Sequence, residues 1–342
     1  ADTIQFNGAV SGSTITFASG ADSLQVVNGL SNSTVVSGVG ADTLSIALRA
    51  LSSSLVSGDG DDQISVDGSL SGTTIFGGSG ADTIRVVGDV ITSKVYGEVD
   101  DELISIGGTA TSSSLFGGSG NDSIVIAGAV IGGNVEGNSG ADSITIAGTA
   151  SAALVAGGLG NDTLILGGVS GGHVGGQLGA DSLQVNGSVL SALVSMASPS
   201  DSDNTDDLAD TFKVTGSVSN STIYSGAGAD LISVDGAVVG GSLFAGADND
   251  TIIVSSSLGG TVVLAGGDDS LSANRLSAAT ISGGDGNDTF TVGASAISSS
   301  VVGGFGTDSI LITTALNNST IYGGSVADGG SAADGNDFIS AS

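Results

Sequence analysis

The 342-residue sequence is short of several residue types, and each shortage excludes a class of protein. It has no cysteine, so disulfides do not stabilise the fold. Pro199 is its single proline among 60 glycines, and glycine without proline or a three-residue period excludes collagen. Five basic residues face 35 acidic ones, for a net charge of −30, which excludes nucleic acid and anionic lipid as partners. No apolar run approaches the ~18 residues of a membrane span, so we expect no membrane insertion.

What the sequence does have is a carboxylate that returns about every 20 residues. One period has glutamate in place of aspartate, directly after Asp101. The series is Asp2, Asp22, Asp42, Asp62, Asp82, Glu102, Asp122, Asp142, Asp162, Asp181, Asp210, Asp230, Asp250, Asp269, Asp288, Asp308 and Asp337. Such a period indicates one structural unit stacked many times, with the carboxylates along one edge. Their mutual repulsion calls for bound cations between them.

One period, residues 117–136, shows the structure that we expect of every coil. A glycine-rich turn leads into an alternating segment with Ile124 and Ile126 facing inward, and after a second turn Val130 and Val135 face inward as well. Glycine and β-branched residues dominate, and no 3.6-residue period persists. The sequence therefore predicts an all-β protein, a parallel β-solenoid (β-roll or β-helix) of about 17 coils of about 19–20 residues, with two short strands per coil.

The rhythm breaks at two acidic segments, residues 199–208 and 325–335. Neither is long enough for a domain, so we expect one continuous solenoid over residues 1–342 with two loop insertions. The first is either a tolerated surface loop or an added cation site that uses its aspartates, Asp201, Asp203, Asp206 and Asp207. Because the sequence begins and ends within a repeat, we expect a segment of a longer chain or a unit that joins copies of itself.

The turn before each carboxylate often reads Gly-Gly-x-Gly-x-Asp-x-apolar-x, complete at 77–85, 117–125, 157–165, 283–291 and 303–311. Its glycines leave loop carbonyls unshielded, and Ca²⁺ takes six to eight hard oxygens at about 2.3–2.6 Å. We therefore expect Ca²⁺ between consecutive turns, held by the carboxylates named above, by Asp101 beside Glu102, and by loop carbonyls. The expected glycine contributors are Gly78, Gly80, Gly118, Gly120, Gly158, Gly160, Gly284, Gly286, Gly304 and Gly306. The alternative is that each aspartate only caps its turn by accepting backbone N–H bonds.

This nonapeptide resembles the calcium-binding repeats of the repeats-in-toxin family, over nearly the whole chain. In that family the motif occurs twice per coil and gives ion rows along both edges. Here the second turn, as in residues 30–34 and 110–114, carries Ser, Thr, Gly and Asn without a periodic carboxylate. We therefore expect several Ca²⁺ ions in one row, and a neutral opposite edge closed by backbone and hydroxyl hydrogen bonds.

Six aromatic side chains follow the inward residue of the later strand, at Phe76, Tyr96, Phe116, Tyr224, Phe244 and Tyr322. Alternation points them outward, where they form ladders that either stabilise the sheet or provide a lateral contact face. His173 is the single histidine and has no nucleophile and carboxylate in register with it. We therefore expect no enzymatic activity and no catalytic residue.

The family resemblance implies an extracellular structural protein of the bacterial cell surface, such as a surface layer, surface filament or matrix, that folds and assembles on binding Ca²⁺. The expected partner is a second copy of the chain, with a cell-surface polysaccharide as a further candidate. Three alternatives stay open: the shaft of a secreted adhesin, an ice-binding solenoid, and the repeat tail of a secreted enzyme. No flat threonine ladder is evident, because the residue after the glycine pair varies from Ser79 to Val99 and Leu159.

Overall fold

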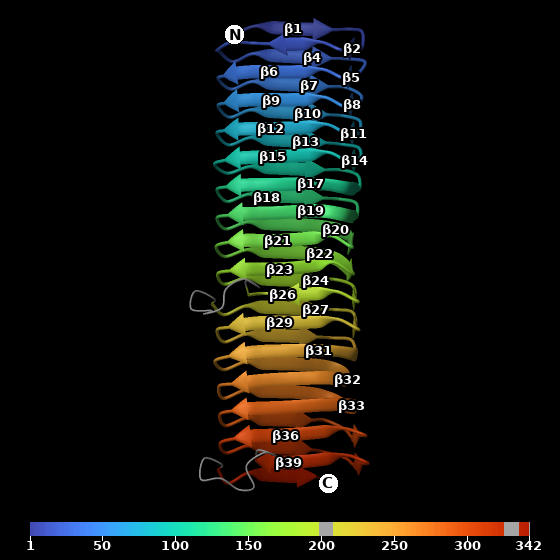
Figure 1. The fold of residues 1–342 in the computed structure, drawn as a ribbon, viewed down its shortest axis with the longest axis vertical. Coiled ribbons are helices and arrows are strands. Elements are labelled where there is room, and N and C mark those ends of the chain that lie inside the picture. Colours follow the sequence, from blue (N-terminus) through green and yellow to red (C-terminus); the bar gives the residue numbers. More distant parts are fainter. Residues whose placement is uncertain (198–207, 325–334, 342) are drawn as a thin grey trace. The chain divides into compact units, whose positions relative to one another are not determined.

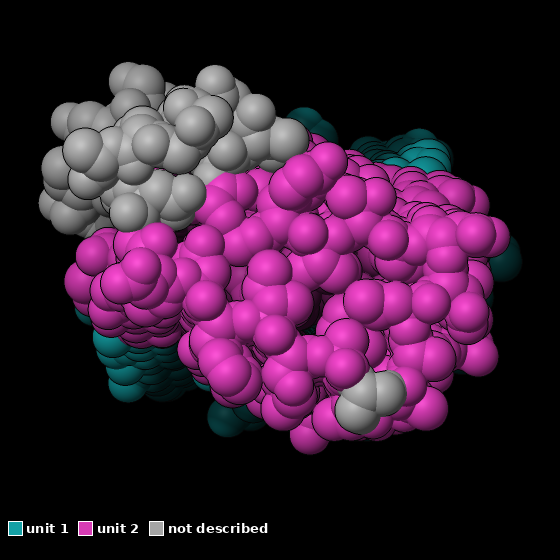
Figure 2. All heavy atoms as spheres, turned by 90° about the horizontal axis from the view of Figure 1, so that it is seen from below, with its two compact units in different colours: residues 1–167 teal, residues 168–342 magenta. Residues whose placement is uncertain are grey.

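The computed structural model describes residues 1–197, 208–324 and 335–341. The described chain is entirely β, and it divides into two compact units, residues 1–167 and 168–342, coloured separately in Figure 2. The aspartates proposed for an added site at 201–207 lie outside the described residues, as do both acidic insertions except Leu208 and Gly335. No helix in these ranges is long and apolar enough to cross a bilayer.

Unit 1 is a stack of similar coils, each with up to three strand segments, and Figure 1 shows β6, β9, β12 and β15 following one another from top to bottom. The first segments are β1 (Thr3–Phe6), β4 (Ser23–Val26), β7 (Thr43–Ile46), β10 (Gln63–Val66), β13 (Thr83–Val86), β16 (Leu103–Ile106), β18 (Ser123–Ile126) and β20 (Ser143–Ser151). Two-residue segments follow in β2 (Val10–Ser11), β5 (Leu30–Ser31), β8 (Ala50–Leu51), β11 (Leu70–Ser71) and β14 (Val90–Ile91). The third segments are β3 (Thr14–Thr16), β6 (Thr34–Val39), β9 (Ser54–Asp59), β12 (Thr74–Ser79), β15 (Lys94–Val99) and β21 (Leu154–Leu159), and β17 (Ala110–Ser119) and β19 (Val130–Ser139) merge the last two segments.

Unit 2 repeats the same coil, and β22 (Thr163–Ser170) contains the boundary between the units. Its first segments are β24 (Ser182–Val185), β27 (Thr211–Val214), β30 (Leu231–Val234), β34 (Thr289–Val292), β37 (Ser309–Ile312) and β40 (Phe338–Ala341). The two-residue segments are β25 (Val189–Leu190), β28 (Val218–Ser219), β35 (Ala296–Ile297) and β38 (Leu316–Asn317). The third segments are β23 (His173–Leu178), β26 (Leu193–Ser195), β29 (Thr222–Ala227), β36 (Ser300–Phe305) and β39 (Thr320–Gly324), and β31 (Val238–Ala247), β32 (Thr251–Gly266) and β33 (Ser270–Asp285) run through the second turn.

Strand pairing within each unit is parallel, and it keeps its register from coil to coil except where β32 pairs with β31 and with β33, whose registers shift near the second turn. In unit 1, Ile64 of β10 pairs with Ile84 of β13, one coil later. In unit 2, Leu183 pairs with Phe212, a longer step that carries the chain past the first acidic insertion without disturbing the register. Each unit is therefore a parallel β-solenoid, as the sequence predicts.

The core of each coil is a set of aliphatic side chains that stack on their counterparts in neighbouring coils. Ile124, Ile126, Val130 and Val135 are all 0% exposed, which confirms the inward set expected for residues 117–136. A fully buried side chain of this size stabilises the fold by about 1.5–3 kcal/mol. The sequence predicted two strands per coil, whereas many coils have a third, two-residue segment between them. This segment forms because its first residue, such as Leu70, is buried and pairs in parallel with Val90 of the next coil.

Candidate cation-binding rows

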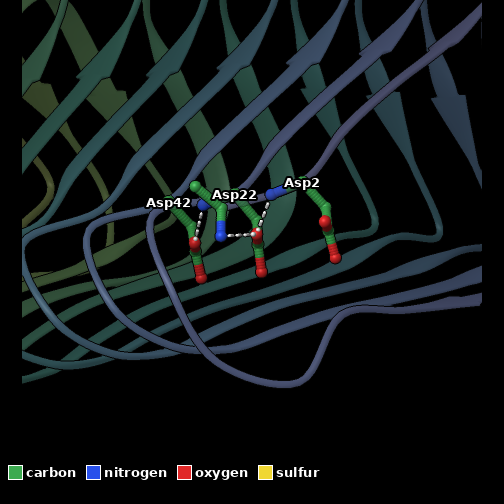
Figure 3. Close-up of polar contacts among 4 residues, drawn as sticks. Asp2, Asp22 and Asp42 are labelled. Carbon is green, nitrogen blue, oxygen red and sulfur yellow. Dashed lines mark hydrogen bonds and ion pairs between the residues drawn. The ribbon is translucent and has the colours of Figure 1, made fainter.

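One carboxylate lies at the start of each coil, directly before the first strand segment, and inside the turn. The carboxylates of this series are only 1–3% exposed from Asp22 to Asp162 in unit 1 and from Asp181 to Asp308 in unit 2. Asp2 is exposed and Asp337 is half-buried. Figure 3 shows Asp2, Asp22 and Asp42 side by side with their carboxylates pointing the same way. The sequence-predicted carboxylates therefore form a continuous row within each unit.

One oxygen of each carboxylate holds the turn of the preceding coil. The backbone N–H of Asp42 donates to Oδ1 of Asp62 at 2.6 Å, and the N–H of Asp62 donates to Oδ1 of Asp82 at 2.8 Å. Unit 2 repeats the bond, for example from the N–H of Asp269 to Oδ1 of Asp288 at 2.9 Å. The turn-capping role that the sequence left as an alternative is therefore present, but it uses only one of the two oxygens.

The second oxygen has no such donor in most coils. Among the described residues, Oδ2 is buried without a hydrogen-bond partner in Asp22, Asp42, Asp62, Asp82, Asp122, Asp142, Asp250, Asp269 and Asp288. Both carboxylate oxygens of Glu102 are buried without a hydrogen-bond partner. Its side chain is longer than that of aspartate, and neither oxygen accepts the backbone N–H of the preceding coil as Oδ1 of the aspartates does. A buried ionised oxygen without a donor costs several kcal/mol, so each of these carboxylates calls for either a bound cation or a proton.

Burial shifts the pKa of the carboxylates upward. It raises the pKa of Asp82 and of Asp288 to about 7 from the ordinary 3.8, and the carboxylates of neighbouring coils add to the shift. The pKa of Asp62 rises only to about 6, where the N–H of Asp42 opposes the effect of burial. Burial and the adjacent Asp122 also raise the pKa of Glu102. Ionising these groups in the folded protein is therefore costly unless a cation is bound.

The chemistry around the unpartnered oxygen fits a hard cation. A Cβ added to Gly77 would lie 2.4 Å from Oδ2 of Asp82 and 2.6 Å from the carbonyl oxygen of Gly97, one coil later. The two oxygens are thus no more than about 5 Å apart, the span of two ligands of one Ca²⁺ at ~2.3–2.6 Å each. Gly283 has the same surroundings in unit 2, with Oδ2 of Asp288 at 2.1 Å and the carbonyl of Gly303 at 2.2 Å from the added Cβ. When bound, the ion would neutralise the carboxylates and join consecutive coils.

Side chains alone do not supply a full set of ligands. No group of three or more His, Cys, Asp or Glu side chains converges on one point in the part of the chain that the structure describes. A site of six to eight oxygens at this edge must therefore combine one or two carboxylates with backbone carbonyls. This composition was expected from the glycine-rich turn.

The ten glycines expected from the sequence lie in two columns, at the second and fourth positions of the motif. All ten have a positive φ, as Gly78 does at 116° and Gly120 at 136°. A Cβ at either position would collide with a carbonyl of the preceding coil, 1.9 Å away at Gly78 and 1.8 Å away at Gly120. These glycines shape the turn. The glycine at the first position, as at Gly77, is the one against the carboxylate. Sequence reasoning missed its role, although the complete motifs show a glycine five residues before the aspartate.

Asp101 was expected beside Glu102 as a ligand, and the structure places it elsewhere. Its side chain is exposed, and its Oδ1 accepts the backbone N–H of Asn121 at 2.7 Å. It belongs to an outer row in which Asp61 and Asn121 accept N–H bonds from Ala81 and Ala141 in the same way. Consecutive residues of the turn face opposite sides, so only Glu102 faces the interior.

The opposite turn is closed by buried hydroxyl groups. The N–H of Thr73 donates to Oγ of Ser93, and the N–H of Ser93 donates to Oγ of Ser113, both at 3.1 Å. The Ser93 hydroxyl in turn donates to the carbonyl of Ile91 at 2.8 Å. This confirms the neutral, hydroxyl-bonded edge expected from the sequence, and the carboxylate row is confined to one turn of the coil.

The outward aromatic ladders are also present. The Phe76 and Tyr96 rings stack at 5.1 Å between centroids, Tyr96 and Phe116 at 5.2 Å, and Tyr224 and Phe244 at 4.7 Å. Tyr322 is 46% exposed. Stacking of this kind contributes to the stability of the sheet, and it leaves ring edges toward solvent.

Comparison with known proteins identifies the repeat. The RTX calcium-binding nonapeptide repeat matches four times, at residues 67–85, 107–125, 213–236 and 280–296. No curated protein matches the chain in sequence. Among solved structures, the chain is similar to a hyperactive, Ca²⁺-dependent, β-helical antifreeze protein from an Antarctic bacterium, with a TM-score of 0.55, 24% identity, and coverage of 76% of this chain and 83% of that one. At this identity the likeness concerns the fold. The protein carries RTX calcium-binding nonapeptide repeats in a parallel β-solenoid.

Proposed function

We propose that this protein is a non-enzymatic, extracellular structural protein whose solenoid folds when Ca²⁺ binds along the carboxylate rows. The observation that carries the proposal is the set of buried carboxylate oxygens without a donor, which at Asp82, Asp142 and Asp288 lie next to a glycine and a carbonyl of the next coil. The RTX repeats and the Ca²⁺ dependence stated for the structural neighbour support it. The expected ion is Ca²⁺, because Mg²⁺ demands a tighter octahedron and gives up its water reluctantly.

In this proposal, binding and folding are one process. Where Ca²⁺ is scarce, a chain with a net charge of −30 repels itself and stays unfolded. Where Ca²⁺ is abundant, the binding free energy becomes folding free energy. This arrangement suits a protein that is exported unfolded and becomes rigid outside the cell.

The test is circular dichroism on metal-free protein titrated with Ca²⁺ or Mg²⁺ at pH 7.5. Ca²⁺ should convert a disordered spectrum to a β spectrum, and millimolar Mg²⁺ should not. A spectrum that is β without any divalent ion, and that Ca²⁺ leaves unchanged, would overturn the proposal.

Assembly into a surface layer, filament or matrix, with a second copy as the partner, is the finer part of the proposal. Both units carry outward aromatic ladders, which suit lateral contact. Electron microscopy of the protein with and without Ca²⁺ tests this part, and particles that stay monomeric with Ca²⁺ would contradict it.

An ice-binding function has less support from the residues of the turn. The outward position between the glycines varies from Ser79 to Val99, Ser119 and Leu159 in successive or alternate coils, so it presents no uniform row. A thermal-hysteresis measurement on the Ca²⁺-loaded protein decides between the two functions.

A further inference from the structure

One buried column next to the carboxylate rows changes its residue type along each unit. It consists of the residues at the first position of the motif, aligned from coil to coil by the strand register, as when Phe76 pairs with Val56 and Gly77 follows Ser57. In unit 1 this inner column reads Phe17, Ser37, Ser57, Gly77, Gly97, Gly117, Gly137 and Gly157, and in unit 2 Gly176, Met196, Ser225, Ala245, Leu264, Gly283, Gly303 and Gly323. Every member that has a side chain is at most 5% exposed.

Where the column has glycine, a carboxylate oxygen occupies the place of the missing side chain. A Cβ would lie 2.2 Å from Oδ2 of Asp122 at Gly117, and 2.1 Å from Oδ2 of Asp142 at Gly137. At Gly137 the carbonyl of Gly157 is also 2.6 Å from the added Cβ. Real Cβ atoms do not make such contacts, so this placement of the carboxylate and the carbonyl exists only in a coil with glycine.

Where the column has serine, its hydroxyl binds the carbonyl of the next coil in the column. Oγ of Ser37 donates to the carbonyl of Ser57 at 2.9 Å, and Oγ of Ser57 donates to that of Gly77 at 2.6 Å. In unit 2, Oγ of Ser225 donates to the carbonyl of Ala245 at 2.7 Å. This carbonyl corresponds to the one that lies beside Oδ2 in the glycine coils, as the carbonyl of Gly97 lies beside Asp82.

Where the column has a larger apolar residue, the same interior space holds carbon atoms. Met196, Ala245 and Leu264 are 0% exposed, and Phe17 is 5% exposed. A side chain there cannot share the space with a carboxylate and a cation placed as in the glycine coils.

We propose that Ca²⁺ binds only in the coils with glycine in the inner column, and that the side chains at the other positions take the place of the ion. This inference rests on the proposed function and names the residue that selects the loaded coils. Among the coils whose carboxylate turn is described, the loaded ones are then those of Gly77 to Gly157 in unit 1, and those of Gly176, Gly283 and Gly303 in unit 2. In the coils of Ser37, Ser57 and Ser225, the hydroxyl group binds the carbonyl that would otherwise face the ion. The protein therefore holds fewer ions than it has carboxylate coils.

The three tyrosines and the absence of tryptophan make a site-resolved test possible. Tyr96 directly precedes Gly97, and Tyr224 directly precedes Ser225, so the two report on a glycine coil and a serine coil. Tb³⁺, an oxygen-seeking stand-in for Ca²⁺, emits when a nearby tyrosine is excited. The test compares Tb³⁺ emission from two full-length variants: Tyr224→Phe with Tyr322→Phe, which keeps Tyr96, and Tyr96→Phe with Tyr322→Phe, which keeps Tyr224.

The variant that keeps Tyr96 should give strong emission, and the variant that keeps Tyr224 should give at least a fivefold weaker signal. Adding Ser225→Gly to the second variant should restore emission and add one bound Ca²⁺ per chain by titration calorimetry. The matched control is Ser221→Gly in the same background, because Ser221 is a buried serine of the opposite turn, and it should leave emission and ion count unchanged.

Equal emission from Tyr96 and Tyr224, or no gain on Ser225→Gly in protein with a β spectrum, would overturn the inference. If neither variant binds Ca²⁺ by calorimetry, the proposed function itself fails, and the two failures are thus distinct. If Ser225→Gly disturbs folding, Gly117→Ser in the wild-type background provides the test instead. The inference predicts that this variant binds one Ca²⁺ fewer by calorimetry while its circular dichroism spectrum stays β, and an unchanged ion count would overturn it.

Discussion

Acid should replace Ca²⁺ in holding the solenoid together, and Asp82 offers a measurement of the effect. Its folded-state pKa of about 7 lies above the ordinary value of 3.8. Protonation therefore stabilises the fold fully below about pH 4, and this contribution is lost as the pH rises through about 7. The loss is about 1.4 kcal/mol per pH unit, and about 4 kcal/mol in total for this one carboxylate.

That magnitude decides the behaviour of the metal-free protein. The net stability of a domain is about 5–15 kcal/mol, so a few such carboxylates ionised together would cancel it. The same loss of stability with rising pH is expected in unit 2, where the pKa is raised to about 8 for Asp250 and to about 7 for Asp288. We expect metal-free protein to be β at pH 5 and disordered at pH 7.5 and above, and Ca²⁺ to restore the β spectrum at the higher pH.

Two asparagine variants separate the buried carboxylate from a general effect of charge. Asp82→Asn removes a buried carboxylate and keeps a carbonyl oxygen for the N–H of Asp62. Asp61→Asn removes the same charge from an exposed side chain that accepts the N–H of Ala81. In metal-free protein, the pH midpoint of the CD transition should rise with Asp82→Asn and stay within a few tenths of a unit with Asp61→Asn. Equal shifts, or a fall with Asp82→Asn, would refute the assignment of the cost to burial.

Three further substitutions test the packing. Gly283→Ala should weaken Ca²⁺ binding and lower the free energy of unfolding in urea by about 1–3 kcal/mol, because the added Cβ would collide with Asp288 and Gly303. The control Gly266→Ala should leave both unchanged, because its Cβ would have no atom within 4 Å. Ile104→Ala should cost about 2–5 kcal/mol, since this side chain is 0% exposed, and a loss below 1 kcal/mol would contradict the packing. Ser113→Ala should cost about 1–3 kcal/mol, because it leaves the N–H of Ser93 without its acceptor, and an unchanged urea midpoint would show that the hydroxyl ladder is dispensable.

Much of the fold can be predicted from local pattern, because every coil repeats the same alternation of inward apolar residues and turn residues. The alternation at Ile124 and Ile126 predicts which side chains face inward, and a single register satisfies all coils at once. The two-residue segments, such as Leu70–Ser71, were not predicted because two residues carry too little pattern. They are held by pairing with the coils above and below, as with Val90.

For the candidate site, the sequence by itself determined the row of carboxylates, its restriction to one turn, and the hydroxyl-bonded turn opposite. These follow from period and residue type, because any stacked repeat brings equal positions together. The tertiary structure decided how each carboxylate is used: one oxygen caps the preceding coil, and in ten coils of the described chain a buried carboxylate keeps an oxygen without a donor. It also placed Asp101 outside and the first glycine of the motif against the carboxylate. The reason is that contacts of a few ångströms between coils depend on the direction of each side chain at the turn, which the period alone does not specify.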